Sequence, residues 1–266
     1  MRRRRGFTLV EALVTVAVLG LLIGVLAPSL GASRDSARAA ACAAALRELQ
    51  VANLSHAASS NGRFVAGAAN IEGANLERWH GRREAVGEPF TPEGGALSAH
   101  LGGAATSEAL RECAGFTWSE VGPEAPGFER GGGGYGYNNA FVGVVRSERG
   151  GVWEIETNRV GSRQERFARP SATAAFTDAG FAADAGLIEY SFAEPPEWPE
   201  HPGSRPDPSV HFRHRGRSGV AWLDGHVTSE ARAFSAWSQL YLSDPGPLGL
   251  GWFGREADGN ALFDYE

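Results

Sequence analysis

The chain has 266 residues, 42% of them hydrophobic and two of them cysteines, so it can bury a sizeable core but cannot form a disulfide-stapled miniprotein or a four-cysteine zinc site. All 25 basic residues are arginines, which excludes enzymes that need a P-loop lysine or a Schiff-base lysine. The net charge is −6, and because Arg2–Arg5 contribute four positive charges, the remainder carries −10 and argues against a nucleic-acid partner.

A basic leader at residues 1–6 precedes a long apolar stretch. Between Phe7 and Ala27 the polar exceptions are Thr8, Glu11 and Thr15. A helix of this length spans roughly the 30 Å hydrocarbon core, so residues 7–30 are predicted to cross a membrane once. The preceding arginines predict a cytoplasmic N-terminus with the rest of the chain outside. A cleaved secretory signal peptide is disfavoured, because the stretch is longer than the usual apolar region of about 7–15 residues.

Glu11 is the unusual residue of this stretch. A charged side chain inside an apolar membrane segment costs about 2.5–3.5 kcal/mol on insertion scales. No basic residue lies nearby on the membrane side. A free α-amine can compensate the charge if the chain is cut between Gly6 and Phe7 and a neighbouring copy places its new N-terminus beside Glu11. The sequence therefore predicts a partner for Glu11 from outside its own chain.

The segment Arg5-Gly6-Phe7-Thr8-Leu9-Val10-Glu11 resembles the processing site of type IV pilins and type II secretion pseudopilins. The resemblance implies that prepilin peptidase cleaves between Gly6 and Phe7 and methylates the amine of Phe7. It also implies that Glu11 pairs with the N-terminus of an adjacent subunit during filament assembly. The implied location is the cell inner membrane, single-pass with an extracytoplasmic head, and the filament or cell surface after assembly.

Residues 31–61 are predicted to continue the same helix outside the membrane. Ala37–Ser59 is rich in alanine, and its apolar stripe consists of Cys42, Leu46, Leu49 and Ala52. Arg47 and Gln50 are expected to lie off this stripe. The dipeptide at residues 61–62, Asn-Gly, is a typical helix stop.

Residues 62–266 are predicted to form an exported α+β head. Their β-branched and aromatic content indicates strands at 141–145, 152–157, 172–178 and 187–192. Residues 218–228 indicate a β-hairpin, in which Val220 and Trp222 alternate with Ala221 and Leu223 before a turn. The Asp224-Gly225 pair of this turn favours the type I′ conformation.

Several segments resemble a family of large pilin-like proteins common in planctomycetes and related bacteria. His214, with nine residues between it and Asp224-Gly225, is similar to the C-terminal H-x9-DG motif of that family. Weaker similarities lie at 41–50 and at 113–114 followed by 135–138, with Ala114 where the family has proline. Cys42 and Cys113 both lie outside the membrane in an oxidising compartment, so they can form a disulfide, with two separate buried thiols as the alternative.

The head contains a group of polar residues that calls for a metal test: His201, His211, His214, Asp224 and His226. Catalytic zinc takes three protein ligands, but no glutamate lies between His211 and His214 to act as a base, and the neighbouring arginines repel a cation. We expect instead that His214 hydrogen-bonds around the Asp224 turn and ties the preceding loop to the hairpin. No zinc site is therefore predicted. Some pseudopilins bind calcium, but the carboxylates lack EF-hand spacing, so no calcium site is identified.

These observations predict an α+β fold in which a long N-terminal helix packs on an antiparallel sheet. The implied function is that of a structural subunit, a pilin or pseudopilin of the minor kind, with no catalytic residues and no cofactor. The implied partners are prepilin peptidase, other subunits, an assembly platform protein, an assembly ATPase and the inner membrane. The alternatives are a monomeric, membrane-tethered extracytoplasmic binding module and, third, a tethered metal-dependent hydrolase.

Overall fold

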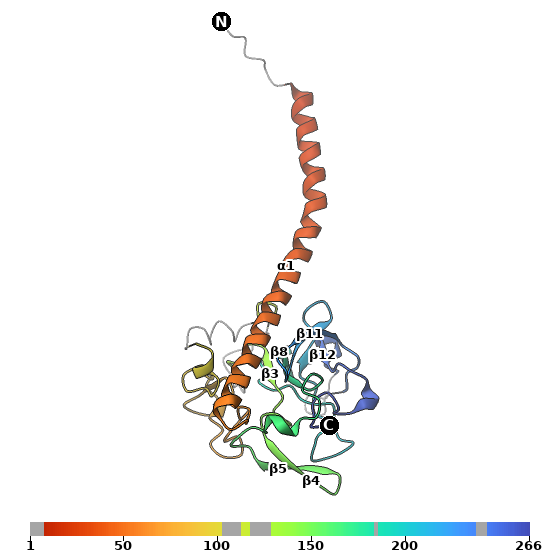
Figure 1. The fold of residues 1–266 in the computed structure, drawn as a ribbon. Coiled ribbons are helices and arrows are strands. Elements are labelled where there is room, and N and C mark those ends of the chain that lie inside the picture. The colour runs from red at the N-terminus through yellow and green to blue at the C-terminus, as the bar shows by residue number, and fades with distance from the viewer. Residues whose placement is uncertain (1–7, 103–112, 118–128, 184–185, 238–243) are drawn as a thin grey trace.

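A computed structural model describes residues 8–102, 113–117, 129–183, 186–237 and 244–266 (Figure 1). Its dominant element is α1, Leu9–Ser59, whose 51 residues correspond to a length of about 77 Å. The N-terminal half of α1 projects away from the head, and the C-terminal half lies against it (Figure 1). The fold is α+β with antiparallel sheets, which confirms the predicted class.

The projecting half of α1, residues 9–30, is apolar and exposed, and we call it the outer half. Every large aliphatic side chain described between Leu9 and Leu30 is at least 49% exposed. The most apolar part of the helix has a mean hydropathy of 2.6, and none of that part is buried in the fold. Length and composition therefore allow this helix to cross a membrane.

The inner half of α1 packs on the central sheet. This sheet contains four antiparallel strands in the order β11, β10, β6, β3. Their bounds are β3 Tyr135–Tyr137, β6 Ala174–Asp178, β10 Arg217–Trp222 and β11 Val227–Ala231. The buried stripe of α1, including Leu46 and Leu49, forms one core with strands β3, β6 and β10. Burial of this stripe stabilises the attachment of the helix to the head.

The remaining strands form two-stranded ladders around the central sheet. They are β1 Glu77–Arg78 with β2 Gly81–Arg82, β4 Val145–Arg149 with β5 Val152–Thr157, β7 Phe181–Ala183 with β8 Gly186–Ile188, and β9 Val210–His211 with β12 Leu250–Gly251. Short 3-10 helices lie at Ser98–His100, Gln164–Arg166, Gly246–Leu248 and Glu256–Asp258.

The end of α1 lies where the sequence predicts it. Asn61 and Gly62 have φ angles of 53° and 74°, and the Gly62 amide donates to the carbonyl of Ala57 at 2.9 Å. This bond satisfies one of the last helical carbonyls, and the left-handed conformation stops the helix.

Two of the predicted strands are placed wrongly. Residues 141–144 form turns and bends, and the strand begins only at Val145. The cause is Asn138, which hydrogen-bonds to backbone amides of the residues that follow it. The Asn138 carbonyl accepts from the amides of Val142 and Gly143, both at 3.0 Å. In the predicted strand at 187–192, β8 ends at Ile188. Val142 and Val144 are buried in the core within turns and bends, whereas Ile188 is the last residue of the β7–β8 ladder.

Candidate functional site

The first turn of α1 is built around Thr8 and Glu11. One carboxylate oxygen of Glu11, Oε2, accepts from both the backbone N–H and the hydroxyl of Thr8, each at 2.8 Å. The Thr8 hydroxyl oxygen accepts in return from the Glu11 amide at 3.3 Å. This reciprocal pattern is a capping box, and it places a carboxylate at the positive end of the helix dipole.

The same geometry leaves room for a further donor. The second oxygen of Glu11, Oε1, has no hydrogen-bond partner among the residues that the structure describes. Gly6 and Phe7, the predicted cleavage pair, lie outside the described residues. Thr8 therefore holds the carboxylate through one oxygen, and within the described residues the other oxygen is left to accept from a further donor.

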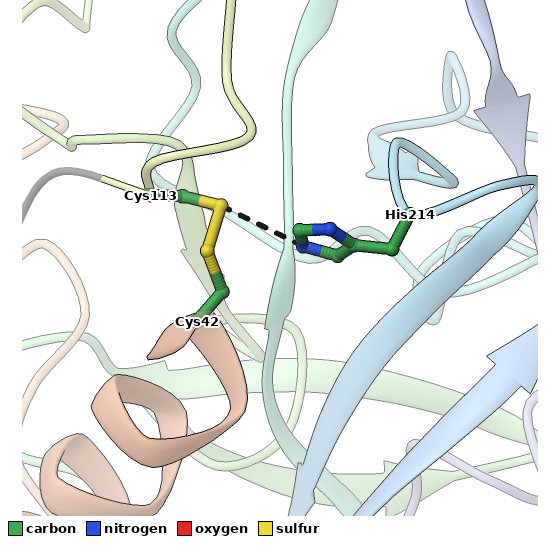
Figure 2. A group of neighbouring side chains, drawn as sticks. All are labelled: Cys42, Cys113 and His214. Atoms are coloured by element: carbon green, nitrogen blue, oxygen red, sulfur yellow. Dashed lines mark hydrogen bonds between the residues drawn. A yellow bond between two sulfur atoms is a disulfide. The ribbon is translucent and has the colours of Figure 1, made fainter. Parts of the chain in front are cut away.

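A second cluster fastens α1 to the head. Cys42 of α1 and Cys113 of the head are joined in a disulfide, with their Cα atoms 5.4 Å apart and a separation of 71 positions in the chain. The imidazole Nε2 of His214 lies 3.7 Å from the Cys113 sulfur (Figure 2). The same nitrogen lies 3.3 Å from Oδ2 of Asp178 on β6. We call Cys42, Cys113, His214 and Asp178 the clasp.

Asp178 is fully buried in the clasp. Its Oδ2 accepts from the Gly219 amide at 2.7 Å, whereas its Oδ1 is buried with no hydrogen-bond partner in the described part of the chain. Arg213, next to His214, donates to the carbonyls of Gly134 and Ala179 at 2.7 and 2.6 Å. The Asp178 charge favours the charged form of Arg213 and partly opposes the fall in its pKa that burial causes.

The prediction that His214 hydrogen-bonds around the Asp224 turn is wrong. His214 reaches Asp178 and Cys113, at the opposite end of β10 from Asp224. Asp224 instead accepts from the ring Nδ1 and the backbone amide of His226, at 2.6 and 3.1 Å. The strand between the two motif residues is extended, and it separates them physically.

The turn of the hairpin also differs from the prediction. Gly225 has a φ of 96°, but Asp224 does not have the positive φ that a type I′ turn needs. The Gly225 amide donates to the Trp222 carbonyl at 2.9 Å, and the loop contains Leu223, Asp224 and Gly225. This longer loop needs a positive φ only at Gly225. The Asp224 carboxylate accepts from the backbone amide of His226.

The nine-residue spacing of the motif has a structural reason. A tight turn follows His214, with φ angles of 55° at Arg215 and 77° at Gly216. The six residues of β10 come next, and Leu223 then leads into Asp224. Two turn residues, six strand residues and one loop residue account for the nine positions. The spacing therefore fixes the length of the strand that lies against α1.

Both ends of this strand are tied to the helix. At the first end, His214 lies against the disulfide of Cys42. At the other end, the side-chain amide of Gln50 donates to the Leu223 carbonyl at 2.8 Å. Gln50 is fully buried, so its predicted position off the apolar stripe is wrong. Gln50 follows Leu46 by four residues, which is about one helical turn and places both on the same face. This spacing is the signal in the sequence that could have indicated the burial of Gln50.

The remaining members of the polar group that was tested as a metal site are not brought together. His211 is buried against the Phe116 ring, and burial, with help from the Arg213 charge, lowers its pKa to about 3. His201 is exposed, and His226 pairs with Asp224 at the surface. Within the described residues, the one group of three close metal-type donors is Cys42, Cys113 and His214. The polar group of the sequence analysis is thus not a single site.

The comparison with protein families identifies the N-terminal region. Residues 1–27 match the family model of the prokaryotic N-terminal methylation motif. The chain carries a prepilin-type N-terminus. This finding supports a type IV pilin-like protein, and the bare apolar half of α1 fits a membrane anchor in such a protein. No curated protein and no solved structure is significantly similar to this pilin-like chain.

Proposed function

We propose that this pilin-like chain is a structural subunit, a pilin or pseudopilin of the minor kind, of a type IV pilus or a type II secretion-like filament. Prepilin peptidase cuts it between Gly6 and Phe7 and methylates the Phe7 amine. The chain is a substrate of that enzyme and is not itself an enzyme. Its further partners are other subunits, an assembly platform protein, an assembly ATPase and the inner membrane.

The observation that supports this proposal most strongly is the exposed apolar half of α1, which overlaps a prepilin-type motif. The described side chains between residues 9 and 30 expose an apolar surface that the described part of the head does not cover. Such a surface must be removed from water by another apolar body. Lipid covers it before assembly, and the helices of neighbouring subunits cover it in the filament.

The geometry at Glu11 supports a specific contact in that filament. Cleavage after Gly6 leaves Thr8 in the chain, so both Thr8 donors continue to hold Oε2 of Glu11. The open oxygen, Oε1, then accepts from the ammonium of a neighbouring Phe7. A charge-assisted hydrogen bond of this kind offsets the cost of an isolated carboxylate in an apolar bundle.

The size of the head supports a minor subunit over the main body of a long fibre. Beyond α1 the chain has about 200 residues, with many loops and short ladders around the central sheet. Of the H-x9-DG residues, His214 lies against the disulfide that joins α1 to the head, and Asp224 directly follows Leu223, whose carbonyl accepts from Gln50.

Replacing Glu11 tests the proposal. In native-host cells, we expect Glu11→Ala to abolish incorporation into filaments sheared from the cells, with normal levels in the membrane. Glu48→Ala removes an exposed carboxylate of the same helix within the head region and is the matched control. Normal incorporation of Glu11→Ala would contradict a role of Glu11 in assembly, whereas absence of the unsubstituted chain from the filaments would favour the monomeric tethered module.

Processing is tested separately by intact-mass measurement of the protein from the native host. The expected mass lacks residues 1–6 and carries one added methyl group. A mass that includes the leader would contradict processing at Gly6 and would reduce the N-terminus to a plain membrane anchor.

A further inference from the structure

We propose that the clasp is a zinc site in the dithiol form of the protein, the form in which every chain is synthesised. One Zn²⁺ binds the thiolates of Cys42 and Cys113 and the Nε2 atom of His214, with its fourth position facing Asp178. The disulfide seen in the structure and the bound metal are then two alternative ways of fastening α1 to the head (Figure 2).

The donor atoms have nearly the spacing of a tetrahedral zinc site. The two sulfurs and the nearest His214 nitrogen all lie within 4.8 Å of one another. With Zn–S of about 2.3 Å and Zn–N of about 2.0 Å, tetrahedral S and N ligands lie about 3.6 Å apart. The distance from the Cys113 sulfur to His214 Nε2 is 3.7 Å. The His214–Cys113 edge of the site is therefore already formed.

The sulfur atoms need only a small displacement. Once the disulfide bond is absent, two thiolates on one zinc ion lie about 3.8 Å apart. The Cα atoms of Cys42 and Cys113 are 5.4 Å apart, and their side chains already point toward each other (Figure 2). Rotation of the two side chains supplies this separation without movement of α1.

Asp178 is the nearest further donor. Its Oδ2 lies 3.3 Å from His214 Nε2, and tetrahedral N and O ligands of zinc also lie about 3.3 Å apart. Asp178 is outside the group whose donor atoms all lie within 4.8 Å, so a shift of its side chain would complete the set. Its Oδ1 is buried without a hydrogen-bond partner in the described residues, which is costly unless a ligand engages the carboxylate.

The charges of the clasp balance when zinc is bound. Two thiolates neutralise Zn²⁺, and the Asp178 carboxylate is balanced by the neighbouring Arg213 guanidinium. The Arg213 charge is faced by the Asp178 carboxylate and by the carbonyls of Gly134 and Ala179, which accept from one of its terminal nitrogens. Arg215 is exposed and lies 3.5 Å from Asp35. The repulsion that the sequence suggests is therefore compensated in the fold.

The chemistry requires no electron transfer. A dithiol chain and one Zn²⁺ give the zinc dithiolate and two released protons, because the thiolate is the ligand. Formation of the disulfide removes both thiolates and so excludes the metal. Cys42 and Cys113 are only 2% and 4% exposed, so a metal bound between them is shielded from water. Zinc would hold the helix on the head in chains whose disulfide has not yet formed.

The test uses the full chain in detergent micelles, reduced with a phosphine under anaerobic conditions, with Co²⁺ as a spectroscopic probe for the zinc site. We expect one Co²⁺ per chain, with thiolate charge-transfer bands and tetrahedral ligand-field bands, displaced by Zn²⁺. The oxidised chain should bind none. Far-UV circular dichroism reports whether reduction preserves the helix.

Variants assign the ligands. We expect His214→Gln to raise the Zn²⁺ dissociation constant by about 100-fold or more, since even a neighbour of a ligand changes affinity by 10–100-fold. His226→Gln, at an exposed histidine that also pairs with an aspartate, should leave it unchanged. Cys113→Ser is the second ligand variant and should remove the two-thiolate spectrum.

Three results would overturn the proposal. The first is a reduced chain that binds no stoichiometric metal, whether it stays folded or not. The second is equal metal binding by the oxidised and reduced chains. The third is unchanged affinity in His214→Gln, shown to be folded by its circular dichroism spectrum.

Discussion

The two halves of α1 are both apolar, yet the fold treats them in opposite ways. The outer half, residues 9–30, is covered by none of the residues that the structure describes, whereas in the inner half Leu46 and Leu49 are almost completely buried. The outer half has apolar residues on every side, whereas the inner half gathers most of its large apolar residues in one buried stripe and exposes arginine, glutamate and Val51 on the other side. A helix that is apolar all round requires an apolar environment, and one with a stripe requires a single packing surface.

The attachment of the inner half shows how the head recognises this stripe. Strand β10 lies along α1 between two anchoring points, the His214 end at the disulfide and the Leu223 end at Gln50. Among the described residues, the outer half makes no polar contact with the head, and Glu11 at its start is bonded to Thr8 of the same turn. Changes in the inner half should therefore alter the stability of the monomer, and changes in the outer half should alter assembly.

The largest expected effect comes from removing the disulfide. Cys42→Ala combined with Cys113→Ala opens a loop closed over 71 positions, for which chain entropy predicts a loss of about 4 kcal/mol. The free energy of unfolding of the head, measured by urea titration in micelles, checks this value. A loss below about 1 kcal/mol would show that the clasp adds little to the attachment of α1.

The next effect contrasts the two halves directly. Leu46→Ala should lower the free energy of unfolding by about 3 kcal/mol, because it leaves a cavity between α1 and the sheet. Leu21→Ala, the same change in the outer half, should leave this free energy unchanged, since Leu21 is 71% exposed in the chain. Equal losses in the two variants would contradict the division of α1 into a packed half and a bare half.

Glu194, a residue of the head, should make the free energy of unfolding depend on pH by about 3 kcal/mol. Burial raises the pKa of Glu194 to about 7, even though the Tyr190 hydroxyl donates to it at 2.7 Å. The folded chain holds the proton more tightly than the unfolded chain, so this contribution is complete below about pH 4.5 and is lost as the pH rises to 7.

Comparison with a non-ionising variant isolates this contribution. Glu194→Gln keeps an acceptor for Tyr190 and should reduce the fall in unfolding free energy between pH 4.5 and 7 relative to the unsubstituted chain. Parallel pH profiles of the two proteins would show that Glu194 does not titrate in this range.

The smallest effect concerns the second anchor of β10. Gln50→Ala removes the bond to the Leu223 carbonyl and should cost about 2 kcal/mol, because that carbonyl is left buried with one partner fewer. Arg47→Ala, at an exposed position on the same helix, should change stability by no more than about 0.5 kcal/mol. A Gln50→Ala variant as stable as Arg47→Ala would place the anchor elsewhere.

Much of the fold could be predicted where a local pattern is sufficient. The apolar run, the Asn61-Gly62 stop, the stripe at Leu46 and Leu49, and the 152–157 strand each depend on neighbours in the chain. The failures occur where a distant group captures the backbone or side chain. Asn138 is fixed by the distant carbonyls of Ala174 and Phe263 and accepts from the amides of residues 141–143, which turns the chain there, and Gln50 is buried by its bond to the distant Leu223 carbonyl.

The candidate site divides in the same way. Its N-terminal part is determined by the sequence, because Thr8, Glu11 and the apolar run are close along one helix and need no other part of the chain to form their arrangement. The clasp was decided by the tertiary structure. His214, Asp178 and Cys113 come from separate segments, and only the pairing of β10 with β6 and the packing of α1 on the sheet bring them to Cys42. Contacts between distant segments depend on strand register and packing, which no local pattern encodes.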